Sequence, residues 1–174
     1  MAEHRVVVGV SGSAASRAAF QRAAREARRR DAVLVPVLAW HPVGGEFAYR
    51  THPCPPLLKV WEQAAQARLD AAFVESFGGY PAGLRVQPVL VRDEQPGRAL
   101  VEVADRADDL LVVSTGKQGR LQRLFHGSVS RYCLAHAHCT VVAVPPSELQ
   151  PAWEASARAD ADTTAQRALT PVAA

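Results

Sequence analysis

Residues 5–20 read RVVVGVSGSAASRAAF. The β-branched run at 5–10 is typical of a short strand that is buried on both faces. Ser11-Gly12-Ser13 predicts a tight turn that ends in a helix cap, and alanines at helical spacing predict a helix from Ala14 to Arg30. The fold is built from this strand–turn–helix unit.

The same alternation continues along the chain. We expect further strands at 33–40, 85–91, 109–114 and 140–144, and helices at about 57–77, 96–106 and 127–137. Pro36 removes a ladder donor, so it predicts that its strand lies near an edge of the sheet or is kinked. Five strands separated by helices predict an α/β fold of Rossmann-like type, a five-stranded parallel sheet with helices on both faces.

The predicted topology also says where a ligand would lie. In parallel sheets ligands bind outside the carboxyl ends of the strands, where the strand order reverses. The loops to examine therefore follow Val10, Ala39 and Ser114.

Length and composition suggest one domain and a tail. The chain has 174 residues, and residues 1–146 carry the whole strand–helix pattern. Residues 147–174 are rich in Ala, Asp, Arg and Thr, and we expect a disordered or loosely docked tail there.

The bulk chemistry excludes several classes of protein. Lys+Arg number 20 against 17 Asp+Glu, a balance too even to indicate a nucleic-acid binder. No apolar stretch approaches the roughly 20 residues of a membrane helix, and the N-terminus is not a signal peptide. The 3 cysteines lack a disulfide-framework spacing. We therefore expect a cytoplasmic protein with no membrane and no nucleic-acid partner.

The stretch LVVSTGKQGRLQRLFHGSVSRYC, residues 111–133, has the shape of a phosphate-binding loop. Glycines let the backbone approach phosphate oxygens, and a helix N-terminus adds partial positive charge. Lys117, Arg120 and Arg123 could neutralise a polyphosphate in place of a metal. The alternative is a structural turn on a solvated loop.

The quoted stretches, and above all HGSVSRYCLAHAHCTVVAVP at 126–145, resemble the universal stress protein family, the UspA domain, over about residues 4–146. The resemblance implies a five-stranded parallel sheet of the adenine nucleotide alpha hydrolase-like kind. It also implies a homodimer, often formed by pairing of the last strand, here 140–144. One branch of the family binds ATP through a G-x-x-G-x9-G-[S/T] motif, and the other branch does not bind nucleotide.

The match to the ATP-binding motif is partial. Gly127 and Ser128 fit its end, but its first two glycines would then fall on Ser114 and Lys117. Gly116 and Gly119 have the right mutual spacing and lie two residues late, which we interpret as an offset in an unshortened loop. The cofactor-binding residues that the resemblance implies are Val10, Ser11, Ala39, Ser114, Gly116, Lys117, Gly119, Gly127, Ser128, Val129 and Ser130.

The first strand departs from the family pattern as well. ATP-binding relatives carry an acidic residue after it, where this chain has Ser11, which cannot hold a divalent cation as a carboxylate does. Trp40 could stack on an adenine or fill the pocket. His136, His138 and Cys139, like His52 with Cys54, lack zinc-like spacing, so we expect no metal.

These observations predict a stress-response regulatory protein that binds an adenine nucleotide, ATP in the first instance, at the ends of the first and fourth strands. One alternative is a dimeric interaction or scaffold protein of the same fold that binds no nucleotide. A weak ATP hydrolase is less well supported, since no serine has a His–acid pair in the sequence pattern, and we expect no catalytic residues.

Overall fold

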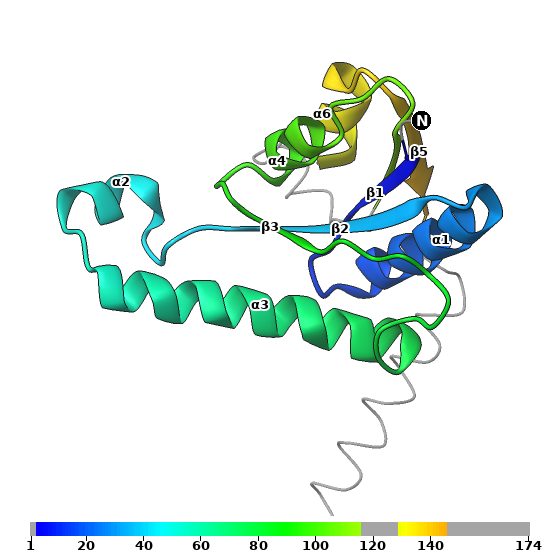
Figure 1. Cartoon of the computed structure of the whole chain (residues 1–174). Helices are drawn as coiled ribbons and strands as arrows, with labels where there is room; N and C mark the ends of the chain where they lie inside the picture. Colours follow the sequence, from blue (N-terminus) through cyan, green and yellow to red (C-terminus); the bar gives the residue numbers. More distant parts are fainter. Residues whose placement is uncertain (1–2, 116–128, 146–174) are drawn as a thin grey trace, which may run out of the picture.

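The central strand of the sheet is β1 (Arg5–Gly9), which pairs in parallel with a neighbour on each side. The computed structural model describes residues 3–115 and 129–145 (Figure 1). The strand order is β3-β2-β1-β4-β5, and every pairing is parallel. The other strands are β2 (Val33–Trp40), β3 (Val89–Arg92), β4 (Leu110–Ser114) and β5 (Thr140–Val144).

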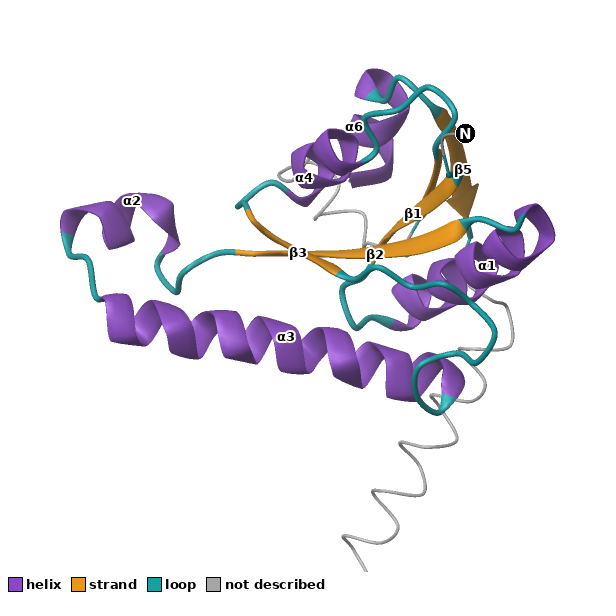
Figure 2. Cartoon of the chain, in the orientation of Figure 1, coloured by secondary structure: helices purple, strands orange, loops and turns teal. Residues whose placement is uncertain are grey.

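Helices cover both faces of this sheet (Figure 2). Helices α1 (Ala14–Arg30) and α3 (Pro55–Phe77) pack on one face, and α4 (Pro96–Val103) and α6 (Val129–His136) pack on the other. Successive β1 side chains alternate between the two cores: Val6 and Val8 join Phe20 and Phe73, while Val7 joins Leu100. The predicted three-layer α/β fold is confirmed.

The helix after β1 begins as the sequence predicted. Ser13 is the N-cap of α1, and its hydroxyl accepts a hydrogen bond from the Ser16 amide at 3.1 Å. Gly12, with φ of +77°, makes the turn between strand and cap. The element bounds of α1 are those expected from the alanine spacing.

Pro36 lies in β2, which is an interior strand next to the edge strand β3, so the expected position near an edge agrees with the strand order. Leu34 and Trp40 direct their backbone hydrogen bonds to the β3 side, so Pro36 faces that side as well. The register Leu34↔Val86 and Val37↔Val89 places Pro36 opposite Pro88, where the ladder is interrupted. The missing N–H of Pro36 therefore coincides with a gap in the pairing, whereas the backbone of Pro88 faces away from β2 by alternation with Gln87.

The same gap shortens the third strand. We expected a strand over 85–91, but residue 86 makes only an isolated bridge and the continuous strand starts at Val89. Pro36 faces β3 but has no N–H to donate to this segment, which explains the break.

A short helix, α2 (Gly45–Thr51), occupies the loop expected between 41 and 56. The Glu46 amide donates to the Glu94 carboxylate, and the Glu46 carboxylate accepts two hydrogen bonds from Arg92, at 2.7 and 2.9 Å. The Arg92 guanidinium also lies 4.7 Å from the ring centroid of Tyr49. Contacts with distant residues thus hold this helix, which explains why local pattern did not reveal it.

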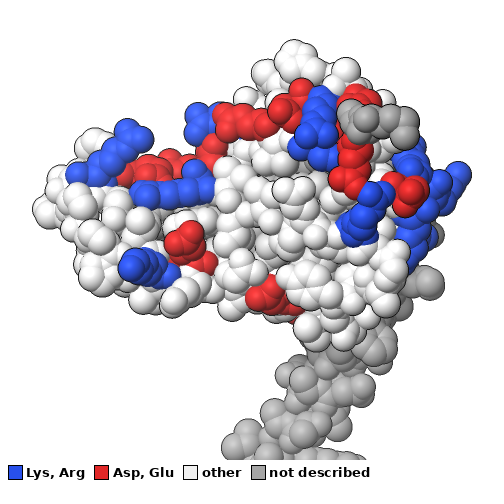
Figure 3. Space-filling model, viewed as in Figure 1, with Lys and Arg blue, Asp and Glu red and all other residues white. Residues whose placement is uncertain are grey.

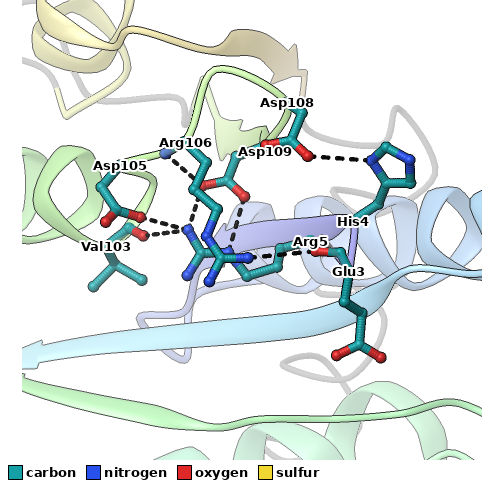
Figure 4. Close-up of polar contacts among 8 residues, drawn as sticks. All are labelled: Glu3, His4, Arg5, Val103, Asp105, Arg106, Asp108 and Asp109. Carbon is teal, nitrogen blue, oxygen red and sulfur yellow. Dashed lines mark hydrogen bonds and ion pairs between the residues drawn. The ribbon is translucent and has the colours of Figure 1, made fainter. Parts of the chain in front are cut away.

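A buried ion pair joins the starts of β1 and β4 (Figure 4). Arg5 donates to both oxygens of the fully buried Asp109 carboxylate at 2.9 and 2.5 Å, and also to Asp105 at 2.6 Å. The hydrogen bond to Asp109 raises the pKa of Arg5, and Arg5 in turn lowers the pKa of Asp105. This bidentate pair ties the two central strands together at the amino edge of the sheet.

Four other helices and strands expected from the sequence, α4, β4, α6 and β5, lie within a few residues of their expected bounds. The 147–174 tail and the first residues expected in the last helix, Gly127 and Ser128, lie outside the described residues.

Truncation of Phe20 tests the main core. Phe20 is fully buried and makes edge contacts with Phe73 and Phe77, each with ring centroids 5.0 Å apart. We expect Phe20→Ala to lower the free energy of unfolding by about 3–5 kcal/mol, as measured by urea denaturation. Phe47→Ala is the control: that ring is 85% exposed, so the change should stay within about 0.5 kcal/mol. Equal effects of the two truncations would contradict the assigned core.

Candidate functional site

At the carboxyl edge of the sheet, β1 stops pairing with β2 and β4 before those two strands end, which leaves an opening between them. The β1–β4 register ends at Val8↔Val112, and the last hydrogen bond to β2 runs from the Val10 amide to the Val37 carbonyl at 2.9 Å. The strand order also reverses between β1 and β4, since β2 and β3 follow on one side and β5 on the other. This is the switch-point position at which parallel α/β sheets bind ligands.

Ala39 presents backbone groups at this opening. In β2 the backbone groups of Val33 and Val37 bond toward β1, so those of Ala39 face the same side by alternation. The Val10–Val37 hydrogen bond is the last between β1 and β2 in the described part of the chain, so the Ala39 N–H and C=O lie beyond the paired segment. A donor and an acceptor on one residue suit the edge of a planar heterocycle.

The turn after β1 supplies hydroxyls beside a helix N-terminus. The Ser11 and Ser13 hydroxyls lie 3.1 Å apart, and both residues are exposed. The Ser11 amide donates to the Ser16 hydroxyl at 2.9 Å, which fixes the turn. Because α1 has 17 residues, its N-terminus carries partial positive charge that favours an anion here.

The fourth strand brings a second serine to the same edge. Ser114 ends β4 and is half-buried, and the next residue, Thr115, donates its amide to the Val144 carbonyl at 2.9 Å. Helix α6 starts at the same edge because it runs back from there toward β5; its first residues are Val129, which is half-buried, and Ser130, which is buried.

The predicted site residues thus divide into two groups. The structure brings Val10, Ser11, Ala39 and Ser114, with Val129 and Ser130, to the carboxyl edge. Five others lie outside the described residues: Gly116, Lys117, Gly119, Gly127 and Ser128.

Trp40 does not offer an open stacking surface. Its side chain is only 8% exposed and belongs to the core under α1 and α3. Its carbonyl accepts a hydrogen bond from the Asp93 amide at 2.8 Å. The indole is therefore part of the domain core, and its burial does not suit stacking on a base.

Asp93 is a buried carboxylate at the same edge of the sheet, and it is absent from the site residues expected from the sequence. It follows β3 and accepts hydrogen bonds at 2.7 Å from both the Gln95 amide and the Arg98 guanidinium. Burial alone would raise the pKa of Asp93, but these hydrogen bonds outweigh it, so the pKa lies below its ordinary value. Asp93 anchors the start of α4, and the aspartate directly after a strand was the only signal for it.

Cys133 packs in the core, whereas Cys54 is exposed. Within residues 3–115 and 129–145, no group of three His, Cys, Asp or Glu side chains could hold a metal ion. Cys133 is fully buried, and burial raises the pKa of its thiol to about 11, so it packs as an apolar side chain.

A hollow of about 350 Å³ lies at the opposite, amino edge of the sheet. It is lined by His4, Arg5, Arg30, Ala32 and Asp108. Its charged groups already have partners: Arg5 binds Asp109, His4 lies 3.5 Å from Asp108, and Arg30 lies 3.6 Å from Glu26. We therefore take the carboxyl edge as the candidate functional site.

The fold and this edge define an α/β protein with a switch-point site. The sequence model of the Universal stress protein family matches residues 3–145, and the chain belongs to that family. A universal stress protein of Mycobacterium tuberculosis H37Rv is 34% identical over 145 residues, covering 80% of this chain and 46% of the relative. One from Mycolicibacterium smegmatis is 33% identical over 150 residues, covering 82% and 48%. The chain thus spans about half the length of the curated relatives it matches.

Solved structures agree with the fold. A universal stress protein in complex with cAMP is 29% identical, with a TM-score of 0.53 over 84% of this chain and 100% of that one. The Archaeoglobus fulgidus universal stress protein in complex with dAMP has a TM-score of 0.51 at 18% identity, over 83% and 98%. None of the helices within the described ranges is long and apolar enough to cross a membrane.

Removing the Asp93 charge tests its anchoring role. The lowered pKa means that its stabilisation is present above the ordinary carboxyl pKa of 3.8 and is lost as the pH falls through the lower folded value. At pH 7, Asp93→Asn should lower the free energy of unfolding by about 1–3 kcal/mol. The difference from the wild type should shrink below about pH 4.

Glu102→Gln is the matched control, since Glu102 also lies near Arg98, at 3.8 Å, but is exposed. Its effect at pH 7 should be small. A pH-independent difference for Asp93→Asn would show that the carboxylate charge does not contribute.

Proposed function

We propose that this universal stress protein is a cytoplasmic stress-response binding module that holds an adenine nucleotide, ATP in the first instance, at the carboxyl ends of β1 and β4. The observation that carries the proposal is the position of the Ala39 backbone beyond the paired part of β1. Its N–H would donate to N1 of adenine, and its C=O would accept from the 6-amino group. The 29% identical relative bound to cAMP supports an adenine ligand.

The phosphates would extend from the base toward α1 and the connection between β4 and α6. Ser11, Ser13 and the α1 N-terminus supply hydrogen-bond donors and partial positive charge on one side. Ser114, Val129 and Ser130 border the other side. The residues that complete the proposed phosphate site from the loop are Gly116, Lys117, Gly119, Gly127 and Ser128.

The same chemistry argues for binding without metal-assisted hydrolysis. Ser11 stands where ATP-binding relatives carry an acid, and the nearby buried acid, Asp93, is engaged by Arg98. Metal-assisted hydrolysis would need a carboxylate that is able to place the ion beside the phosphates. We therefore propose a binding protein, with the lysine and arginines of residues 116–128 neutralising the phosphates.

We further propose a homodimer formed through the free edge of β5. The Val144 carbonyl bonds toward β4, so the Ala143 backbone faces outward by alternation. An edge strand with outward N–H and C=O groups can pair with its symmetry mate. A scaffold of this kind, with no nucleotide, is the rival function. The division into a domain at 1–146 and a tail at 147–174 is also part of the proposal.

Base selectivity tests the adenine assignment. Guanine reverses the pattern at the two positions that Ala39 would contact, since it carries a 6-oxo acceptor and an N1–H donor. ATP should therefore bind at least about tenfold more tightly than GTP in calorimetric titrations, because a mismatched edge leaves the backbone groups unpaired. EDTA should leave the ATP affinity unchanged. Equal affinity for the two nucleotides would contradict the Ala39 contact, and no heat with either would favour the scaffold.

Two exposed glycines with similar positive φ angles provide a matched pair of variants. Gly12 and Gly83 have φ of +77° and +68°, and a Cβ would meet no atom within 4 Å at either. Alanine at such a position costs about 1–2 kcal/mol of stability in each case. Only Gly12→Ala should also weaken ATP binding, by about tenfold or more, because its Cβ would project where the phosphates approach. Equal ATP affinities for the two variants would exclude the turn from the site.

Substitution at the sheet edge tests the β5 dimer. Ala143→Pro removes one outward N–H without breaking a β4 ladder bond, so the monomer should still fold. We expect light scattering to give a mass for the Ala143→Pro protein that is half the mass of the wild-type assembly. An unchanged mass would place any dimer interface elsewhere.

A further inference from the structure

Helix α3 carries a second apolar face that points away from the sheet. Its inner face packs into the core through Ala65, Leu69, Ala72 and Phe73, which are all buried. A separate apolar row lies on exposed positions at alternating spacings of three and four residues. The row, here called the outer seam, consists of Leu57, Val60, Ala64, Ala67, Ala71 and Val74.

The exposure of the seam is substantial at its large residues. Leu57 is 41% exposed, Val60 55% and Val74 61%, and the three alanines between them are exposed as well. Alternating spacings of three and four give an average of 3.5 residues, the period at which one helix faces another along its length. A helix face that contacts only water does not require a regular row of apolar residues, so the pattern points to a helical partner.

The helix is also longer than the sheet that supports it. Its 23 residues span about 35 Å, whereas the eight residues of β2, the strand on which it packs, span about 26 Å. Figure 1 shows the first half of α3 extending beyond the sheet toward α2, with no described element on its far side. In the view of Figure 3, the surface over α3 carries few charges, while charged side chains gather along the rim above it.

We propose that the outer seam binds the outer seam of a second copy of this chain, with the two α3 helices antiparallel. The order of residues is self-complementary about the middle of the seam. Antiparallel pairing places Leu57 against Val74, Val60 against Ala71 and Ala64 against Ala67 of the second copy. A two-fold axis generates every pair twice, as an isologous interface requires.

The side-chain sizes suit this arrangement. Alanines at the centre allow the two helices to approach closely, and larger residues close both ends of the seam. A partner with large residues along its whole seam would overpack the alanine centre. The seam therefore selects a copy of itself over a generic apolar helix.

The flanking charges are compatible with the same pairing. Gln63 comes opposite Asp70 of the second copy, and Trp61 comes opposite Arg68 of the second copy. The first pair allows a hydrogen bond, and the second lets a guanidinium pack on an indole. No acidic residue meets another acidic residue across the seam, so the charges permit antiparallel self-association.

This interface is separate from the nucleotide site and from the β5 edge. Helix α3 packs on the face that α1 covers, whereas β5 ends the far side of the sheet. Association through α3 should therefore persist in Ala143→Pro and should not require nucleotide. Its failure would leave the nucleotide proposal untouched.

The test compares Ala67→Lys with Gln66→Lys, each made in the Ala143→Pro chain. Both add one positive charge to an exposed position of α3, but only residue 67 belongs to the seam. Sedimentation over a concentration series should show dimers for Ala143→Pro alone and with Gln66→Lys. Ala67→Lys should weaken the dimer by about tenfold or more. Indistinguishable behaviour of the two lysine variants, or a monomer in the Ala143→Pro chain, would overturn the proposal.

Cross-linking tests the register independently of affinity. In a Cys54→Ser chain, which lacks the exposed native thiol at the start of α3, Ala64→Cys with Ala67→Cys should give a disulfide-linked dimer on mild oxidation. Gln66→Cys in the same background should remain uncross-linked. The reverse outcome, or no cross-link in either, would contradict antiparallel pairing about the centre of the seam.

Discussion

The early end of β1 is the constraint on which the rest of this structure depends. β1 is the central strand, and it stops pairing with β4 at Val8 and with β2 at Val10. Its two neighbours run on beyond it, so the sheet opens at the middle of its carboxyl edge. The Ser11–Ser13 turn and the N-terminus of α1 then lie at the opening, with the Ala39 backbone on one side and Ser114 on the other. A longer β1 would close this opening with ordinary sheet hydrogen bonds.

The opposite edge holds β1 in the register that produces the opening. The buried Arg5–Asp109 pair joins the starts of β1 and β4, and loss of one partner would leave an uncompensated buried charge. The valines of β1 add to this, since Val6, Val7 and Val8 are fully buried and serve both cores. The protein therefore combines a tightly fixed amino edge with an open carboxyl edge.

Local patterns predicted the parts that depend on local physics. The β-branched runs, the Ser13 cap and the alanine spacing of α1 gave the element order and most bounds. Three features depend on strand register or on particular side-chain contacts. The alignment of Pro36 with Pro88, the attachment of α2 to Arg92 and Glu94, and the Asp93–Arg98 contact could not be read from spacing. Ala39 was expected at the site, but the direction of its backbone groups follows only from the strand register. The apolar spacing of the outer seam is present in the sequence. Without knowing which face of α3 packs on the sheet, however, these residues could not be distinguished from core residues.

The nucleotide site, the β5 edge and the outer seam lie on different parts of the fold, and the central claim is the adenine site at the end of β1. Amide chemical shifts measured by NMR during titration with ATP test it most directly. The account predicts shifts at Ser11, Gly12 and Ala39, with little change at Arg5 and Ala32 on the opposite edge. Shifts confined to the amino edge, or none at saturating nucleotide, would contradict it.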